Sequence, residues 1–157
     1  MTVDEKFMKQ ALLLAQQAAD EGEVPVGAVV VRDGVVIGQG RNRRELGKNA
    51  LAHAEIEAID MACRTLGGWR LSGCDLYVTL EPCPMCAGAI INARIDRVIQ
   101  GAVDPKAGSC GSVVDLFSLP YNNRPLLVRG VLEDKCSEML RDFFRSLRRA
   151  RKEGDEL

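Results

Sequence analysis

The stretch 75-DLYVTLEPCPMCAGAIINARIDRVIQG-101 decides the fold, because it combines a strand, a helix and a second strand. Asp75 to Leu80 and Arg97 to Gly101 are apolar and rich in β-branched residues, which is typical of buried strands. The intervening Pro84 to Asn92 is predicted to be a helix. Strands that alternate with helices favour a parallel sheet with helices packed on it.

The residues before this stretch predict an antiparallel edge to the same sheet. Asp4 to Asp20 carries apolar residues at helical spacing. Val24 to Val31 and Val35 to Ile37 are two strands separated by Asp33-Gly34, a hairpin turn signal. His53 to Leu66 then returns to helical spacing.

After residue 101 a glycine-containing loop leads to a last strand, Leu126 to Val131, and a closing helix, Glu133 to Arg151. We expect the order α-β-β-α-β-α-β-α-β-α, which places a helix between the fourth and fifth strands as well. This order predicts an α/β fold, a three-layer α/β/α sandwich around a mixed five-stranded sheet. With no repeat or linker visible, residues 1–157 are expected to form a single domain.

Composition restricts the function and the location. The net charge of −1 gives no global attraction for nucleic acid, so an RNA ligand would need a local basic patch. The N-terminus does not have the pattern of a signal peptide, and no apolar run reaches the length of a membrane span. We therefore expect a cytoplasmic protein with no membrane partner, whose six cysteines are thiols or metal ligands.

A metal site is predicted from one histidine and two cysteines. His53 is the single histidine of the chain and begins H-A-E at a predicted helix start, while Cys83 and Cys86 open the next helix. One nitrogen and two sulfurs suit zinc, and three protein ligands with an open fourth position are typical of a catalytic zinc site.

Other interpretations of these residues fit less well. A lone histidine is often a satisfied polar group, and a C-x-x-C pair also occurs as a redox couple, but a redox couple would need no H-A-E partner. A closed structural zinc site would need a fourth ligand, for which the remaining cysteines are candidates; we interpret all four as small buried hydrophobic residues. These are Cys63, Cys74, Cys110 and Cys136.

Glu55 is the predicted proton carrier. At a helix N-terminus the side chains of the first turn lean toward the helix start, so His53 and Glu55 can meet in front of it. Two thiolates cancel the formal charge of zinc, and a carboxylate that removes a proton from bound water would compensate for the weaker Lewis acid. The alternative is that Glu55 only stabilises the first turn of the helix.

The pattern H-x-E followed by P-C-x-x-C is the motif of the zinc nucleobase deaminases. H-A-E-I-E-A-I at 53–59 and T-L-E-P-C-P-M-C-A-G-A at 79–89 resemble that motif. Further stretches along nearly the whole chain resemble bacterial tRNA-specific adenosine deaminases. They are V-P-V-G-A-V-V-V at 24–31, Asn42, W-R-L at 69–71, R-I at 94–95, G-A-V-D-P-K-A-G at 101–108 and D-F-F-R at 142–145.

This resemblance implies a cytidine deaminase-like fold and the conversion of adenosine to inosine at the wobble position, 34, of an arginine tRNA with an ACG anticodon. It also implies a homodimer with one Zn²⁺ per subunit. The metal ligands that it implies are His53, Cys83 and Cys86, and it implies Glu55 as the proton shuttle.

The resemblance also implies contacts to the RNA. Asn42 would hydrogen-bond the flipped base, Asp104 would contact the flanking nucleotide, and Asn122 matches the first residue of an Asn-His-Arg triplet. Here the triplet is Asn122-Asn123-Arg124, so the histidine is absent. For Asn42 and Asp104 the alternative is an ordinary turn residue.

The last predicted helix supplies the basic patch that an RNA ligand needs. Six cations fall within the twelve positions 141–152: Arg141, Arg145, Arg148, Arg149, Arg151 and Lys152. We interpret Arg145, Arg148 and Arg149 as contacts to the anticodon loop, although cations near a helix C-terminus can also be a solvated face that favours the helix dipole.

Two other functions remain open beside tRNA deamination. One is a deaminase of free nucleobases or nucleosides, of the guanine or cytosine type. The other is a zinc-stabilised RNA-binding module without catalysis.

Overall fold

The computed structural model describes residues 1–156. Leu157, the last residue of the predicted domain, and the side chains of Asp155 and Glu156 lie outside the described part of the chain. Five strands form one sheet in the order β2-β1-β3-β4-β5. Their bounds are β1 Gly27–Arg32, β2 Val35–Arg41, β3 Cys74–Leu80, β4 Arg97–Ala102 and β5 Leu126–Val128.

The sheet is mixed, as predicted. β1 pairs antiparallel with both β2 and β3, whereas β4 is parallel to β3 and β5 is parallel to β4. The β1–β2 turn has positive φ at both central residues, 51° at Asp33 and 76° at Gly34, which matches the twist of a two-residue hairpin.

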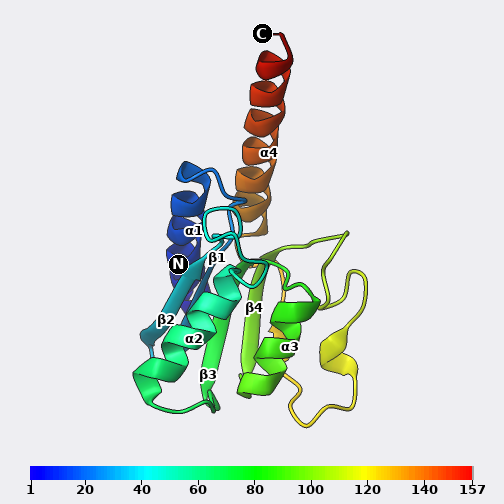
Figure 1. Ribbon diagram of the computed structural model, residues 1–157. Helices are drawn as coiled ribbons and strands as arrows, with labels where there is room; N and C mark the ends of the chain where they lie inside the picture. Colours follow the sequence, from blue (N-terminus) through cyan, green and yellow to red (C-terminus); the bar gives the residue numbers. More distant parts are fainter. Residues whose placement is uncertain (157) are drawn as a thin grey trace.

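Four helices cover the two faces of the sheet, which confirms the three-layer sandwich (Figure 1). They are α1 Val3–Asp20, α2 Ala54–Leu66, α3 Pro84–Ala93 and α4 Glu133–Glu156. One hydrophobic core lies between the sheet and α2 and α3, and a second lies between the opposite face and α1 and α4.

Glycines in the strands let α2 approach the sheet closely. A Cβ atom at Gly38 would meet the backbone of Ala58 and Ala62 on α2. A Cβ atom at Gly40 would meet the Ala54 carbonyl and the Ala58 nitrogen. The small residues on both elements therefore determine the distance between α2 and β2, and with it the position at which α2 begins.

The prediction of a helix between the fourth and fifth strands is wrong. That segment contains one short 3₁₀-helix, η1 Leu116–Ser118, because prolines and glycines interrupt the rest of residues 103–125. β5 ends at Val128 rather than residue 131, since Gly130 adopts a φ of 78° in the turn to α4. β1 begins at Gly27 rather than residue 24, and β2 continues to Arg41 rather than residue 37.

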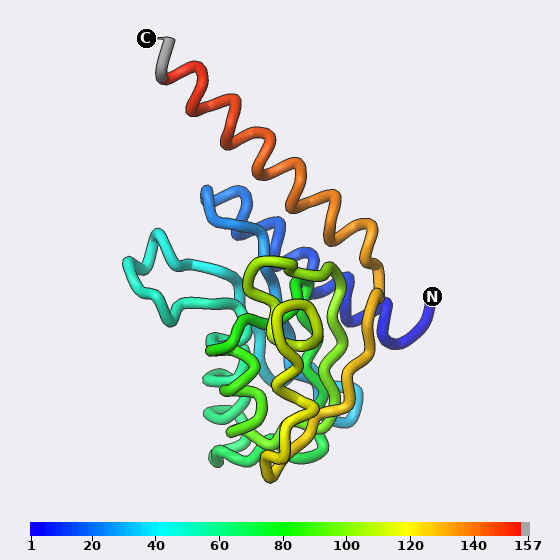
Figure 2. The backbone as a smooth tube through the Cα atoms, turned by 90° about the vertical axis from the view of Figure 1, so that its right-hand side faces the viewer, coloured from blue at the N-terminus to red at the C-terminus, as the bar shows by residue number. Residues whose placement is uncertain are grey.

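The C-terminal half of α4 extends past the sheet and α1 into solvent (Figure 2). α4 continues to Glu156, beyond the predicted end at Arg151, and Arg148 to Gly154 are all exposed. Within residues 1–156, no helix combines the length and the apolar character that crossing a membrane requires.

Replacing Gly40 with alanine is expected to destabilise the fold. The new Cβ would overlap the α2 backbone, and overpacking of this kind costs about 1–3 kcal/mol. Urea unfolding followed by circular dichroism should show a lower midpoint with an unchanged slope. Gly68→Ala is the matched control, because a Cβ there would meet no atom within 4 Å. Equal midpoints for the two variants would contradict the close packing of α2.

Candidate metal centre and active site

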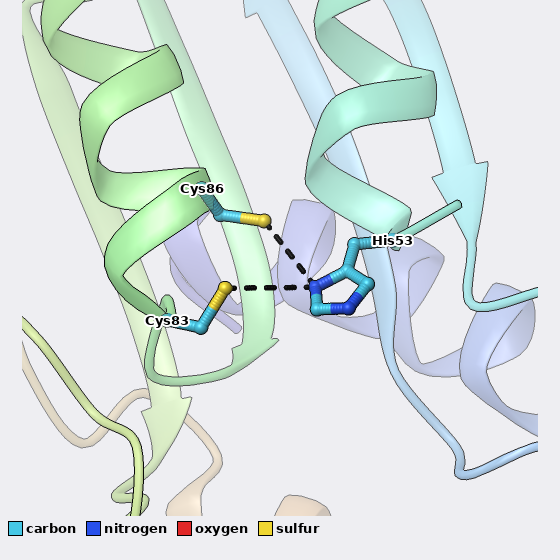
Figure 3. Close-up of side chains that lie close together, drawn as sticks. All are labelled: His53, Cys83 and Cys86. Carbon is cyan, nitrogen blue, oxygen red and sulfur yellow. Dashed lines mark hydrogen bonds between the residues drawn. The ribbon is translucent and has the colours of Figure 1, made fainter. Parts of the chain in front are cut away.

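Two helices begin at the same point of the molecule and bring His53, Cys83 and Cys86 together (Figure 3). His53 is the N-cap residue of α2 and Cys83 is the N-cap residue of α3, with Pro84 at the first helical position. Neither N-cap side chain makes the capping hydrogen bond that usually closes a helix start. Both side chains are therefore available to a common ligand, as the sequence predicts.

The spacing of the three donor atoms fits a tetrahedral metal ion. The Nδ1 atom of His53 lies 3.6 Å from Sγ of Cys83 and 3.5 Å from Sγ of Cys86. Tetrahedral zinc with ordinary Zn–N and Zn–S bonds separates nitrogen and sulfur by about 3.6 Å. All three donors lie within 4.8 Å of one another. They form the one such cluster found among the described residues.

The charges at the cluster favour a thiolate. Hydrogen bonds from Cys86 and His53 lower the pKa of Cys83 to about 4, although burial opposes the shift. The hydrogen bond to Cys83 and burial raise the pKa of Cys86, because one of two adjacent thiols keeps its proton. The hydrogen bond to Cys83 raises the pKa of His53. A divalent cation would compensate the charge of two thiolates.

Glu55, the second residue of α2, lies beside this cluster. It is 4% exposed, and burial raises its pKa to about 7. Cys83 adds to the rise, whereas His53 and Cys86 lower the pKa. A carboxyl group with a pKa near neutrality can both accept and release a proton, which is what a proton carrier requires.

A cavity of about 190 Å³ opens beside the cluster and reaches the loops after β2 and β4. Its apolar wall is made by Val24, Val26, Ala54, Leu80 and Ala107. Its polar groups are Asn42, Arg44, His53, Glu55, Glu81, Cys83 and Asp104. Apolar walls with a few convergent polar groups are typical of sites for small rings or bases.

Asn42 and Asp104 line this cavity, and both also stabilise their own loops. The Asn42 amide donates to the Val24 carbonyl at 3.2 Å and accepts from the Arg44 nitrogen at 3.1 Å. One donor hydrogen and one acceptor lone pair remain on that amide. Oδ1 of Asp104 accepts from the Lys106 and Ala107 nitrogens, the turn role given above as the alternative.

The remaining predicted RNA contacts lie outside the cavity. Lys106 lines a separate groove together with Arg145 and Arg148 of α4. Arg149 is exposed on the same helix. Asn122 is exposed near the start of β4, where the neighbouring Asn123 side chain donates to the Ile95 carbonyl, at the opposite end of the sheet from the metal cluster. Within one chain, the structure does not bring Asn122 to the cavity.

Two charged residues that line the cavity, Arg44 and Glu81, were not predicted from the sequence. Nor was Glu23, which is 1% exposed and accepts hydrogen bonds from the backbone of Glu45 and Leu46 in the loop after β2. Glu81 directly follows a strand and precedes Pro82. An acidic residue directly after a strand could have indicated this role, because a carboxylate there can accept hydrogen bonds from the N–H groups of a nearby loop.

The four other cysteines do not join the metal cluster. Cys74, Cys110 and Cys136 are buried in the hydrophobic cores, and Cys63 is half-buried on α2. All four are free thiols, and burial raises the pKa of each. No fourth cysteine therefore closes the cluster within residues 1–156.

The mixed sheet, the His-Cys-Cys cluster at two helix N-termini and the buried glutamate define the class of deaminases with a cytidine deaminase-like fold. Residues 2–148 match the family model of the MafB19-like deaminases. The chain is 49% identical to the tRNA-specific adenosine deaminase of Bacillus subtilis over 97% of its length and 95% of that protein.

Solved structures agree with this class. One, from a study of A-to-I editing by tRNA:A34 deaminases at the wobble position, is 49% identical with a TM-score of 0.83 and covers 86% of this chain and 99% of that one. A guanine deaminase from Bacillus subtilis is 41% identical with a TM-score of 0.62 and covers 73% of each chain. The chain belongs to the family of tRNA-specific adenosine deaminases, within the MafB19-like deaminases.

Cys83 is expected to be the most reactive of the six thiols in metal-free protein. Its low pKa keeps it ionised at pH 6, where a model thiol is ionised in only about one molecule of several hundred. Brief iodoacetamide treatment at pH 6, followed by peptide mass spectrometry, should label Cys83 first. Cys63, also half-buried but with a raised pKa, is the internal control. Equal labelling of both would contradict the charge distribution described here.

Proposed function

We propose that the chain catalyses hydrolytic deamination of adenosine to inosine at position 34 of tRNA, with an arginine tRNA bearing an ACG anticodon as substrate. The supporting observation is that a chain 49% identical to a tRNA-specific adenosine deaminase holds a His-Cys-Cys cluster and a buried carboxyl group at one cavity. The unpaired loop of an anticodon suits such a cavity, because releasing an unpaired base costs the least free energy.

His53, Cys83 and Cys86 would hold one Zn²⁺ per subunit. Their donor set of one imidazole and two thiolates is that of zinc rather than of harder cations. Bound zinc supplies a Lewis acid that lowers the pKa of water toward neutrality.

Glu55 is the proton carrier of the reaction. It takes one proton from the attacking water and delivers it to the N1 atom of adenine. The oxygen bonds to C6, and Glu55 then carries the remaining proton of that oxygen to the exocyclic nitrogen. The bond between C6 and this nitrogen breaks as ammonia leaves. Adenosine and water become inosine and ammonia, and the Glu55 carboxyl group returns to its initial state.

The loops around the cavity bind the nucleotides. Asn42 uses its remaining donor and acceptor for the flipped base, and Asp104 contacts the flanking nucleotide. Arg145, Arg148 and Arg149 on α4 bind backbone phosphates. The groove that Lys106 shares with Arg145 and Arg148 supports this role, since it begins two residues from Asp104. A tRNA substrate also supports a cytoplasmic location.

A homodimer is the expected assembly, with α3 in the interface. This helix has no charged residue, and Met85, Gly88 and Ala89 form part of its outward face. A Cβ at Gly88 would meet nothing within 4 Å, so the glycine has no packing role inside one chain. A helix without a polar face is normally buried, and a second copy would cover it beside Cys83. Asn122 would contact an RNA bound at the cavity in one of two ways. Either the asparagine belongs to this second copy, or the RNA extends to the opposite end of the sheet.

The test of the reaction compares wild type with Glu55→Ala. Wild-type protein with zinc should produce inosine at position 34 of the arginine tRNA, measured by nuclease digestion and mass spectrometry. Glu55→Ala removes the proton carrier and should lose turnover by at least about 100-fold, the general range for acid–base catalysis. It should keep its zinc and its affinity for tRNA.

Each alternative function gives a different result in the same assay. Rapid turnover of free guanine or cytosine, with Arg145, Arg148 and Arg149 dispensable, would indicate a free-base deaminase. Metal and RNA binding with no turnover in either protein would indicate a binding module. No inosine at full zinc occupancy would refute the proposed reaction.

Ala89→Arg tests the assembly. A charge on the outward face of α3 should prevent burial of that face, so light scattering after gel filtration should give the mass of one chain instead of two. Glu138→Arg on α4 is the control and should remain dimeric. A monomeric wild type, or a dimeric Ala89→Arg, would contradict an interface through α3.

A further inference from the structure

The loop after β4 is folded around a single buried carboxylate. Glu81, at the end of β3, is 3% exposed. Its Oε1 accepts hydrogen bonds from the Asp104 nitrogen at 3.1 Å and from the Ser112 hydroxyl at 2.5 Å. Its Oε2 accepts from the Cys110 nitrogen at 3.1 Å and the Ser112 nitrogen at 3.0 Å. The two ends of residues 104–112 are therefore held at one point.

All acceptor sites of this carboxylate are occupied. An ionised carboxylate has about four lone-pair positions and no donor, and here each oxygen accepts two bonds. Each partner is a neutral N–H or O–H group, and such charge-assisted bonds are roughly twice as strong as neutral ones. A glutamine amide in the same place would have to direct its NH₂ group, which cannot accept a hydrogen bond, toward some of these donors.

The loop also has the shape that this contact needs. A side chain at Gly108 would overlap the Glu81 carboxyl group, so only glycine lets the loop close over it. The Ser109 nitrogen donates to the Pro82 carbonyl at 2.8 Å, which fastens the centre of the loop beside Glu81.

This loop carries one wall of the substrate cavity. Asp104 and Ala107 line the cavity, and Lys106 lines the basic groove beside α4. The metal cluster does not depend on the loop in the same way. The His53 and Cys83 carbonyls accept the first bonds of their own helices, from the nitrogens of Glu57 and Ala87.

We propose that Glu81 is a positioning residue, which holds residues 104–112 as the wall that receives the nucleotide beside the target. The proposal rests on the function proposed above. It assigns Glu81 to substrate binding rather than to the chemical step, because its hydrogen bonds hold the loop and not the metal cluster.

The test uses Glu81→Gln in the zinc-loaded protein. Two of the four bonds would be lost, and the KM for an arginine anticodon stem–loop should rise roughly ten-fold or more, while kcat changes by less than about three-fold. Zinc content should equal that of wild type. Hydrogen exchange should become faster at the amides of residues 104–112 and remain unchanged in α2 and α3.

Two further variants make the result specific. Asp96→Asn is the matched control, since that carboxylate accepts a bond from the Gly73 nitrogen at the opposite end of the sheet and should leave KM unchanged. Ser112→Ala removes one of the four bonds and should raise KM by a smaller factor, about three-fold. If Glu81→Gln does not fold, Ser112→Ala decides by the same measurements.

Unchanged KM and unchanged exchange in residues 104–112 would overturn the proposal. Loss of zinc with a collapse of kcat would overturn it as well, because Glu81 would then support the metal cluster. If wild type makes no inosine, the proposed reaction fails, and the exchange data alone still decide whether Glu81 holds the loop.

Discussion

Two helices that begin at one edge of the sheet are the constraint on which the active site depends. β2 and β3 both run antiparallel to β1, so they run in the same direction and their carboxyl ends share an edge. α2 and α3 follow these two strands and therefore start side by side. His53 and Cys83 are the residues just before each helix, where free N–H groups and the helix dipole stabilise a thiolate.

The same edge explains why carboxylates hold the loops of the cavity. The loops after β2 and β4 have no strand partners for their backbone N–H groups, and buried N–H groups without partners are costly. Glu23 accepts two of them in the first loop, and Glu81 accepts three in the second. Rigid loops beside a reactive centre are thus obtained with two side chains instead of additional strands.

Much of the fold was predictable from local patterns. Helical spacing placed α1 and α2, and Asp33-Gly34 placed the hairpin, because each feature depends on neighbours in the chain. The helix expected between β4 and β5 disregards a local signal, because prolines and glycines interrupt residues 103–125. The path of this segment was not predictable, since it follows contacts to Glu81 and Ile95 that no periodicity within the segment reveals.

The site was predictable to the extent that motifs encode it. Spacing and residue type were sufficient to bring His53, Cys83 and Cys86 together, since both helix starts are visible in the sequence. Arg44 and Glu81 were not predicted, because their place at the cavity depends on how two loops meet. The hydrogen bonds of Glu81 link residues about thirty positions apart, beyond the range of a local pattern.

The extension of α4 has a consequence for what can be a good substrate. The helix has 24 residues and is about 36 Å long, and its last turns, from Arg148 to Gly154, are exposed and extend away from the rest of the chain (Figure 2). The cavity and the groove lined by Arg145 and Arg148 share no lining residue, so a single nucleoside bound in the cavity leaves the arginines of the groove without a ligand. Only a polymer of nucleotides spans both, and binding energy gained far from the reacting atoms favours that polymer alone. On the proposed function, α4 therefore favours polymers of nucleotides over single nucleosides without contacting the target base.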